Sequence, residues 1–298
     1  MKSEPPTPRF AAEVLVTWFR KEGRELPWRE PDVSPWHILV SEIMLQQTPV
    51  SRVAPVWQQW VTRWPLPSTM AAESPATVVR AWGKLGYPRR ALRLHDCART
   101  LAEEFDDQVP SDIDVLLTLP GVGAYTARAV ACFAYGQSVP VVDTNVRRVI
   151  ARAVHGQAEP GNPSTNRDLR DAAALIPEID GDIFSAALME LGAVTCTARN
   201  PDCARCPLPH CAWVAAGRPP YEGPPRKTQG FAGTDRQVRG RIMDVLRTAS
   251  GPVDRSRIDA AWLTDTTQRD RALLSLLTDG LVEQTMDGQF ALVGEGES

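Results

Sequence analysis

The 298-residue sequence has no apolar run that approaches the length of a membrane-spanning helix. Its first eight residues are polar and rich in proline, and they lack the apolar h-region of a secretory signal peptide. Nor does charge of one sign dominate, since the formal net charge is only -3. We therefore expect a cytoplasmic protein without a membrane partner. Any contact with nucleic acid must then depend on local clusters of cations and on backbone amides.

Alternation of polar and apolar residues, the pattern of a half-buried strand, is also missing between residues 50 and 105. Prolines divide this region into short segments with helical periodicity. Hydrophobic residues make up 43% of the chain and charged residues 23%. This composition indicates a globular protein that is long enough for one large core or two domains.

Arginine, in contrast, is locally concentrated in three places. The clusters are Arg89, Arg90 and Arg93; Arg147, Arg148 and Arg152; and Arg236, Arg239 and Arg241. Each cluster alone is more typical of a solvated helix face than of a DNA contact, so none of them decides the function.

The stretch at residues 119–145 carries the most organised local signal. Pro120 ends the preceding segment, and Gly121 and Gly123 allow a tight hairpin that opens on a small-residue helix at residues 126–134. The free amide N–H groups at a helix N-terminus can hold a phosphate without any charged side chain. The hairpin is therefore either a clamp on a DNA backbone or an ordinary corner between helices with a glycine C-cap.

Two acidic residues stand in unusual surroundings. Glu42 lies in the most apolar stretch of the chain, in a helix expected from about Pro35 to Pro49, where burial favours the protonated carboxyl. Asp143 precedes another helix and can serve as its N-cap, where the helix dipole favours the ionised carboxylate. One protonated and one ionised carboxyl is a pair that glycoside chemistry uses. Each residue also has a purely structural explanation. Glu42 can belong to the polar stripe of a half-buried helix, and Asp143 can be a plain N-cap.

Four of the six cysteines lie in a single loop, at Cys196, Cys203, Cys206 and Cys211. Without a secretory signal, disulfides are not expected and a metal explains the spacing better. Zinc commonly takes paired Cys-x-x-Cys knuckles from two places, whereas one loop around one centre suits a four-iron, four-sulfur cubane. The spacing favours the iron-sulfur cluster, and the adjacent His210 is a spectator or a substitute ligand.

Two aromatic residues stand in turns next to glycines or arginines. Trp28 lies in the loop Arg24-Glu25-Leu26-Pro27-Trp28-Arg29, and Tyr87 lies in the corner Trp82-Gly83-Lys84-Leu85-Gly86-Tyr87-Pro88. Such a ring either packs in the core, or stacks on a heterocycle or inserts between bases.

Together these motifs resemble those of the helix-hairpin-helix, iron-sulfur DNA glycosylases, and among them the MutY-type adenine glycosylases. The matching runs are Leu-Pro-Trp-Arg at 26–29, Ser-Glu-Ile-Met-Leu-Gln-Gln-Thr at 41–48, Leu-Gly-Tyr at 85–87, Leu-Pro-Gly-Val-Gly at 119–123, Val-Asp-Thr-Asn-Val at 142–146, and the cysteine loop. They extend from residue 10 to about residue 215, and the run at 41–48 is diagnostic.

The resemblance implies an all-α fold with the substrate base flipped into a groove between two helical domains. Residues 1–30 and 136–215 would form the iron-sulfur helical domain, and residues 31–135 a six-helix barrel with the helix-hairpin-helix. A linker rich in proline and glycine would follow at residues 216–235, before a C-terminal domain at residues 236–298.

The resemblance also implies roles for individual residues. Glu42 would protonate the leaving adenine, and Asp143, assisted by Asn145, would stabilise or trap the oxocarbenium ion. Tyr125 stands where the lyase-competent relative endonuclease III carries a Schiff-base lysine, so no lyase step is expected. The residues around the flipped adenine would be Arg24, Trp28, Arg29 and Glu190. Gln47 and Tyr87 would probe the base stack opposite it. The hairpin residues Gly121, Val122 and Gly123 would bind a DNA phosphate.

Some features depart from the family pattern. The last cysteine spacing is four residues where five is usual, Pro88 replaces a second aromatic, and Thr144 replaces the more common glycine. The family usually adds a Nudix-like domain that reads 8-oxoguanine, and here only a short segment follows the linker. Its pattern predicts helices at 236–248, 254–261 and 266–278, then strands at 281–285 and 289–293 around Asp287-Gly288. This is a winged-helix pattern, either a packing appendage or an extra DNA contact.

We therefore expect a monomeric, monofunctional glycosylase that removes adenine mispaired with 8-oxoguanine or guanine from double-stranded DNA, carries a [4Fe-4S] cluster and associates with the nucleoid when bound to DNA. One alternative is a thymine/guanine mismatch glycosylase of the same superfamily, which can share Tyr125 and Asp143. Another is an iron-sulfur DNA-binding module without catalysis. The pairs Gln46-Gln47 and Trp28-Arg29 favour adenine, and the presence of Glu42 together with Asp143 argues against a pure binder.

Overall fold

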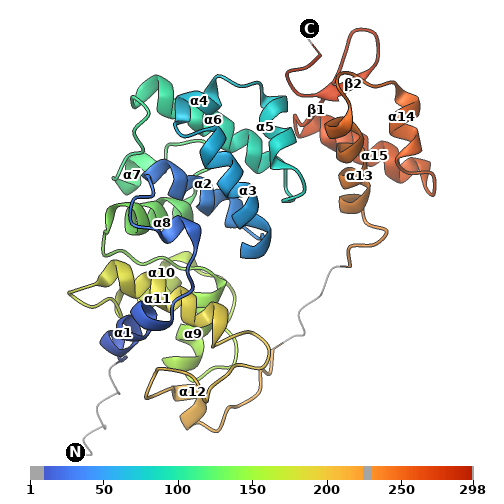
Figure 1. Ribbon diagram of the computed structural model, residues 1–298. Coiled ribbons are helices and arrows are strands. Elements are labelled where there is room, and N and C mark those ends of the chain that lie inside the picture. Colours follow the sequence, from blue (N-terminus) through green and yellow to red (C-terminus); the bar gives the residue numbers. More distant parts are fainter. Residues whose placement is uncertain (1–9, 224–229, 297–298) are drawn as a thin grey trace, which may run out of the picture. The chain divides into compact units, whose positions relative to one another are not determined.

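The computed structural model describes residues 10–223 and 230–296 (Figure 1). The polar segment at residues 1–8 and residues 224–229 of the expected linker lie outside the described residues. Contacts within the chain define two compact units. Their described parts are residues 10–38, 110–118 and 122–223 in the first unit, and residues 39–109, 119–121 and 230–296 in the second. The four-part division expected from the sequence stays a prediction.

The first unit is helical. Its elements are α1 (Ala12–Glu22), the 3-10 helix η1 (Pro27–Arg29), α7 (Ile113–Leu116), α8 (Ala124–Tyr135), α9 (Thr144–Ala153), α10 (Thr165–Ala173), α11 (Gly181–Val194) and α12 (Ala212–Ala215). Helix α2 (Pro35–Leu45) begins in this unit and ends in the second. Side-chain caps start two of these helices, because Asp112 accepts from backbone N–H groups of α7 and Asp143 from one of α9.

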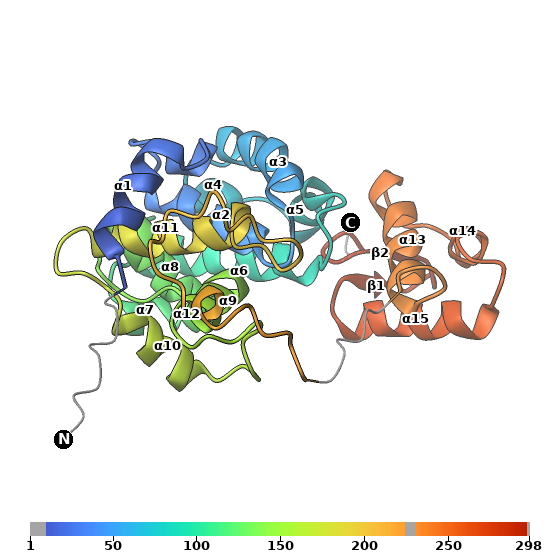
Figure 2. The same ribbon diagram turned by 90° about the horizontal axis from the view of Figure 1, so that it is seen from below.

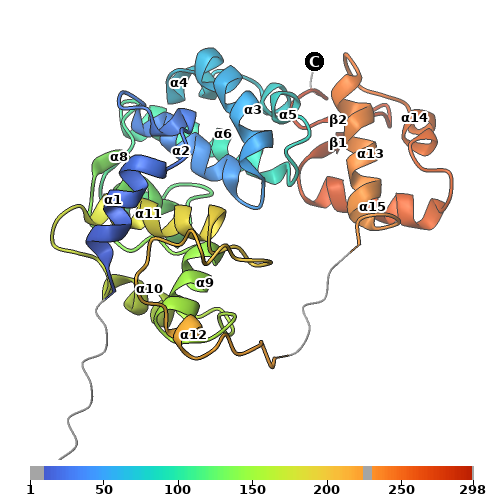
Figure 3. The ribbon, with the colours of Figure 1, turned by 60° about the horizontal axis from the view of Figure 1, so that its bottom comes forward.

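Helices α1, α9 and α11 enclose the main core of the first unit, with α1 alongside α11 in Figure 3. Leu15, Phe184 and Leu191 are buried in this core. Where α9 meets α11, a Cβ atom added to Gly192 would lie only 2.7 Å from the Cβ atom of Asn145. The glycine therefore lets the first turn of α9, which begins after Asp143, approach the backbone of α11.

The second unit contains the remaining helices and a two-stranded sheet. Its elements are α3 (Val50–Arg63), α4 (Pro67–Ala71), α5 (Pro75–Trp82), α6 (Arg89–Glu104), α13 (Asp235–Thr248), α14 (Arg255–Ala260), α15 (Thr266–Thr278), β1 (Val282–Gln284) and β2 (Phe290–Leu292). Tryptophans join α3 to α5, since the Trp60 ring centroid lies 4.7 Å from that of Trp64 and 5.5 Å from that of Trp82, in edge-on arrangements.

Residues 230–296 of the second unit are called the C-terminal lobe here. Helices α13 and α15 pack against each other in it (Figure 2), and β1 pairs antiparallel with β2 so that Val282 faces Leu292. Val253 adds an isolated bridge to Phe290. The helices and strands of the lobe occupy the residue ranges predicted from the sequence, and the winged-helix assignment stays a prediction.

The expected all-α class is confirmed. In residues 10–223 and 230–296, the sheet content is limited to β1, β2 and the bridge at Val253. Over the same ranges, no helix combines the length and the apolarity that a bilayer crossing requires.

Candidate active site and cluster pocket

In the first unit, Glu190 of α11 joins two of the arginines expected around adenine. Arg24 donates to Glu190 Oε1 from Nε at 2.5 Å and to Oε2 from Nη2 at 2.9 Å, and Arg29 Nη2 donates to Oε2 at 3.0 Å. The Glu190 side chain is fully buried. Burial alone would raise its pKa, but the two guanidinium groups hold that pKa below its usual range. Trp28, which stands between Arg24 and Arg29 in the sequence, belongs to η1 and is buried, as expected of a packing residue.

Asp143 anchors a second polar group at the start of α9. Its Oδ1 accepts the Val146 N–H at 2.7 Å, which confirms the expected N-cap, and its Oδ2 accepts from Asn145 Nδ2 at 2.7 Å. The sequence favours the ionised form, yet burial raises the pKa of Asp143 above its ordinary value although these hydrogen bonds lower it. Desolvation therefore outweighs the helix cap in its effect on this pKa, and the ionised form stays a prediction.

The Asp143 group continues inward through an arginine. Arg148 Nη2 donates to Asn145 Oδ1 at 2.8 Å and to the Gly192 carbonyl at 2.6 Å. Its Nε donates to the backbone carbonyl of Cys196 at 2.8 Å. A continuous chain of hydrogen bonds thus links the Asp143 carboxylate to the first cysteine of the loop.

Tyr125 projects from α8 in the same unit. It is half-buried beside Phe133 and Val141, and its hydroxyl lies 4.0 Å from the Met189 sulfur. A phenol in this position offers no amine for a Schiff base.

In the second unit, Glu42 is buried on α2 with 5% of its surface exposed. The end of this helix is closed by Arg90, which the sequence had grouped with a surface cluster. The acceptors of the Arg90 guanidinium are the carbonyls of Ile43, Met44, Gln46 and Gly86 and the Thr48 hydroxyl, at 2.5 to 3.0 Å. Burial lowers the pKa of Arg90 to about 10. This arginine is thus a cap for α2 rather than a solvated cation.

Gln47 and Tyr87 lie in the two corners that Arg90 joins. Both are non-glycine residues in the left-handed region, with φ of 56° at Gln47 and 48° at Tyr87. Such backbone conformations cost of order 1–3 kcal/mol and persist where the surroundings enforce them, often at functional sites. The Tyr87 side chain is 43% exposed, and the guanidinium carbon of Arg90 lies 5.6 Å from its ring centroid.

Each residue of the Leu-Pro-Gly-Val-Gly hairpin has its own environment. Gly121 has φ 77°, and a Cβ there would lie 2.8 Å from the Cβ of Arg93, so the position requires glycine. Val122 is buried, whereas Gly123 is exposed and forms the N-cap of α8. The hairpin therefore leads into an open helix N-terminus at Gly123, as the sequence predicts.

The cysteines at 196, 203, 206 and 211 all line one cavity of about 210 Å³ in the first unit. The shortened last spacing thus still brings the fourth cysteine to the shared wall. Burial raises the pKa of the Cys206 thiol to about 11 and that of Cys196 in the same direction. His210 is exposed and does not line the cavity, as expected of a spectator.

Buried cations surround this cysteine cavity. Arg152 is 4% exposed, and it donates to Cys196 Sγ at 3.5 Å and to the Thr197 carbonyl at 2.7 Å, and lies 4.9 Å from the Trp213 ring centroid. Arg148 does not line the cavity but donates to the backbone carbonyl of Cys196 in the same loop. A four-iron cluster with four thiolates carries net negative charge, which buried guanidinium groups offset. The four cysteines and the two arginines therefore fit such a cluster.

Sequence reasoning missed the roles of Arg90, Arg148 and Arg152. It interpreted their clusters as helix faces, and the structure places all three in internal hydrogen bonding. The available signal for Arg90 was α2 itself, because the residues that follow it, Gln46 and Gln47, provide no glycine cap for its last carbonyls.

Comparisons with known proteins agree with this geometry. Residues 40–174 match the profile of the HhH-GPD superfamily base excision DNA repair protein, and residues 196–208 match the iron-sulfur binding domain of endonuclease III. The solved structure of a thermostable thymine-DNA glycosylase superposes with a TM-score of 0.63 at 28% identity, covering 69% of this chain and 95% of that chain. Fold and profiles define the class as a helix-hairpin-helix base excision DNA repair protein.

Relatives with nearly the same length refine the class. The chain is 63% identical over 291 residues to the adenine DNA glycosylase of Mycobacterium tuberculosis, which covers 97% of this chain and 96% of the relative. It is 63% identical over 285 residues to that of Mycolicibacterium smegmatis, covering 95% and 96%. The chain belongs to the adenine DNA glycosylase family. It carries a [4Fe-4S] cluster, and the cysteine loop at residues 196–211 is the binding region.

Proposed function

We propose that this protein hydrolyses the N-glycosidic bond of adenine mispaired with 8-oxoguanine or guanine in double-stranded DNA. The observation that carries the proposal is the 63% identity, over almost the whole chain, to adenine DNA glycosylases. The expected catalytic residues Glu42 and Asp143 are both present, and each is supported by its surroundings. We also propose that the protein acts as a monomer on nucleoid DNA.

Glu42 is the general acid of the proposed mechanism. Breaking the bond requires a proton on the departing adenine, and a buried carboxyl on α2 suits that transfer because burial favours the protonated form. Arg90 supports the role by fixing the end of α2 through its backbone carbonyls.

Asp143 supports the developing positive charge on the sugar. Two hydrogen bonds, from the Val146 N–H and from Asn145 Nδ2, hold its oxygens in place. Asn145 is itself oriented by Arg148 at 2.8 Å. Because the carboxylate is positioned before the reaction, little reorganisation is needed when the oxocarbenium ion forms.

Arg24, Arg29 and Glu190 supply the proposed adenine site, and the buried Trp28 stands between the two arginines in the sequence. Glu190 fixes the two guanidinium groups, whose exposed portions can donate to the ring nitrogens of a purine. We propose that Gln47 and Tyr87 contact the opposite strand, and that the amides of Gly121, Val122 and Gly123 bind a DNA phosphate.

Tyr125 limits the proposed reaction to base removal. Since no amine replaces the Schiff-base lysine at this position, the product is an abasic site with an intact backbone. The cluster, when bound, supplies iron–thiolate cross-links that hold the cysteine loop. Arg148 connects this loop to Asn145 through hydrogen bonds of 2.8 Å at both ends.

The test is single-turnover cleavage, after alkali treatment, of duplexes with one central pair. The pairs are adenine opposite 8-oxoguanine, guanine, cytosine or thymine, and thymine opposite guanine. Cutting at adenine opposite 8-oxoguanine and guanine is expected, and cutting without alkali is not. In Glu42→Gln the rate should fall about 100-fold or more. Glu104→Gln, at an exposed position at the end of α6, is the matched control with unchanged rate.

The second candidate is thymine excision from guanine mispairs. The fold shared with the thymine-DNA glycosylase at a TM-score of 0.63 favours it. The same duplex panel decides between the two candidates, since cutting confined to thymine opposite guanine would replace the adenine assignment. An absence of cutting in every duplex would leave a DNA-binding protein without catalysis.

A further inference from the structure

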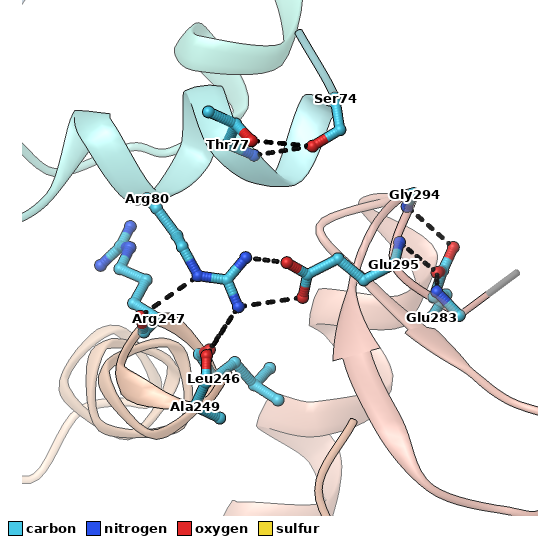
Figure 4. A network of polar contacts seen from close by, with 10 residues as sticks. Ser74, Thr77, Arg80, Leu246, Arg247, Ala249, Glu283, Gly294 and Glu295 are labelled. Carbon is cyan, nitrogen blue, oxygen red and sulfur yellow. Dashed lines mark hydrogen bonds and ion pairs between the residues drawn. The ribbon is translucent and has the colours of Figure 1, made fainter. Parts of the chain in front are cut away.

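The C-terminal lobe is fastened to α5 by Arg80 (Figure 4). The Arg80 guanidinium forms a two-pronged ion pair with Glu295, and it also donates to the carbonyl of Ala249 at 2.8 Å and to that of Arg247 at 3.3 Å. Glu283 in turn accepts the Glu295 N–H at 2.9 Å, which fixes the loop that carries Glu295. Arg80 thus holds the end of α13 and the last loop of the lobe at the same time.

A cavity of about 610 Å³ lies where α13 meets the corner that carries Tyr87. We call it the α13 pocket. One wall contains Gln47, Arg52 and Tyr87, and the facing wall contains Phe231, Arg236 and Arg241 of the C-terminal lobe. Two residues that the family resemblance assigns to the opposite DNA strand thus share a cavity with residues of the lobe.

The α13 pocket is strongly basic although the chain is net negative. Its lining cations are Arg52, Lys84, Arg236, Arg239, Arg241 and Arg247, and its lining carboxylate is that of Asp244. Arg239 is neutralised by Asp279, at 2.6 Å, outside the lining. Within the described residues, Arg236 and Arg241 form no ion pair, and both side chains are exposed. These two guanidinium groups are therefore available to an external anion.

Aromatic rings complete the pocket. The guanidinium carbon of Arg236 lies 4.8 Å from the Tyr87 ring centroid and 5.7 Å from that of Phe231. Both rings are about half exposed. Aromatic rings beside guanidinium groups that have no ion pair suit a ligand with both a flat heterocycle and a phosphate. The heterocycle can stack on a ring, and the phosphate can pair with a guanidinium group.

We propose that the α13 pocket binds a nucleotide of the DNA strand that passes the Tyr87 corner. Arg236 and Arg241 bind its phosphodiester, and the base lies against the Tyr87 and Phe231 rings. The C-terminal lobe is then a second DNA-binding element rather than a packing appendage. The inference rests on the proposed function, because that function brings duplex DNA to the Tyr87 corner.

The experiment is equilibrium binding of the full-length protein, with its cluster, to a duplex that carries a tetrahydrofuran abasic analogue opposite guanine. Affinity is measured over a range of salt concentrations. Arg236→Glu and Arg241→Glu should each reduce the slope of log K against log salt by about 1, and the double variant by about 2. The affinity of the double variant should fall about tenfold or more. Arg257→Glu, an exposed arginine on α14 outside the pocket, is the matched control with unchanged slope.

Conservative variants separate charge from folding. Arg241→Lys retains the charge and should retain the slope, whereas Arg236→Lys should retain the slope but lose affinity because lysine stacks poorly on a ring. Thermal melting and the visible absorbance of the cluster verify that each variant is folded. If the pocket variants bind with the slope of Arg257→Glu, the inference is wrong.

The outcome is separable from that of the proposed function, because the abasic duplex tests binding without requiring excision. Slope changes in a protein that excises no adenine would overturn the activity and support the pocket. Adenine excision with unchanged slopes would support the activity and overturn the pocket.

Discussion

Arginines bind the cysteine loop and also line the α13 pocket, but the two regions use their arginines in opposite ways. Around the cysteine cavity, Arg148 and Arg152 are buried, and their donors are taken by backbone carbonyls, by side-chain oxygens of Asn145 and Glu159, and by a cysteine sulfur. In the α13 pocket, Arg236 and Arg241 are exposed and carry no ion pair among the described residues. The two clusters look alike in the sequence. The comparison teaches that an arginine cluster indicates a ligand site only when its donors remain available.

Among the tests of this difference, removal of the iron should have the largest effect on the protein. Without the cluster, the buried guanidinium groups lose its negative charge, although Arg152 keeps its ion pair with Glu159, and the cysteine loop loses the iron–thiolate bonds that cross-link it. We expect oxidation in the presence of a chelator to unfold the first unit, as a loss of helical circular dichroism that follows the loss of visible absorbance. Recovery of the helical signal after reconstitution with iron and sulfide is the control for direct damage by the oxidant. If the iron-free protein kept its full helicity, the conclusion that Arg148 and Arg152 serve to hold the cluster region would be wrong.

The second-largest effect is expected at Asp143, where the chain of hydrogen bonds to the cysteine loop begins. Asp143→Asn keeps an N-cap but removes the charge that opposes the oxocarbenium ion, so the single-turnover rate should fall at least about 100-fold. Asp265→Asn, at the N-cap of α15, is the matched control because its side chain accepts from Gln268 N–H at 2.9 Å in the same manner. An equal loss of rate in both variants would show that Asp143 acts only as a helix cap and does not stabilise the oxocarbenium ion.

The fall of the wild-type single-turnover rate at acid pH gives a second test of the role of Asp143. Burial raises the folded-state pKa above the ordinary value of 3.8, so protonation removes the required charge at a higher pH than for an exposed aspartate. The single-turnover rate should therefore fall as the pH decreases through a pKa above 3.8. A rate that stays constant down to the ordinary aspartate range would contradict the assignment.

Arginine deletions compare the two pockets directly. Arg148→Ala leaves the Asn145 amide oxygen and the Gly192 and Cys196 carbonyls without their donor, and should cost about 3 kcal/mol of unfolding free energy. Arg241→Ala removes an exposed side chain and should change stability by less than about 0.5 kcal/mol. Denaturant titration of the two variants measures both values, and similar losses would erase the distinction.

Acid should remove a smaller part of the stability. The folded-state pKa of Glu190 is lowered below its ordinary value of 4.5 by Arg24 and Arg29. A lowered carboxyl pKa stabilises the fold above the unfolded-state pKa, and this contribution is lost as the pH falls through the folded-state value. Denaturant titrations below pH 4.5 should therefore show declining stability in the wild type. Glu190→Gln, already lacking the charge, should start lower and decline less.

The elements of the fold follow from local patterns, and for that reason the sequence predicts them well. Helical periodicity, the N-cap at Asp143 and the close spacing of the four cysteines are all properties of short segments. The arginine contacts are different, because Arg148 and the Cys196 carbonyl are 48 residues apart and Arg90 and the Ile43 carbonyl are 47 apart. Pairings of this kind depend on how helices pack, which periodicity does not encode. The raised pKa of Asp143 was not predicted either, since it results from burial, which the local pattern of an N-cap does not encode.

Arg90 also has a mechanical consequence. One guanidinium group joins the end of α2 and the Gly86 corner, so the segments that carry Gln47 and Tyr87 are cross-braced. The backbone carbonyls next to Gln47 and Tyr87 therefore share one donor group, and the two corners cannot separate without breaking its hydrogen bonds. If Gln47 and Tyr87 contact the opposite DNA strand as proposed, this brace would present the two side chains to that strand at a fixed spacing.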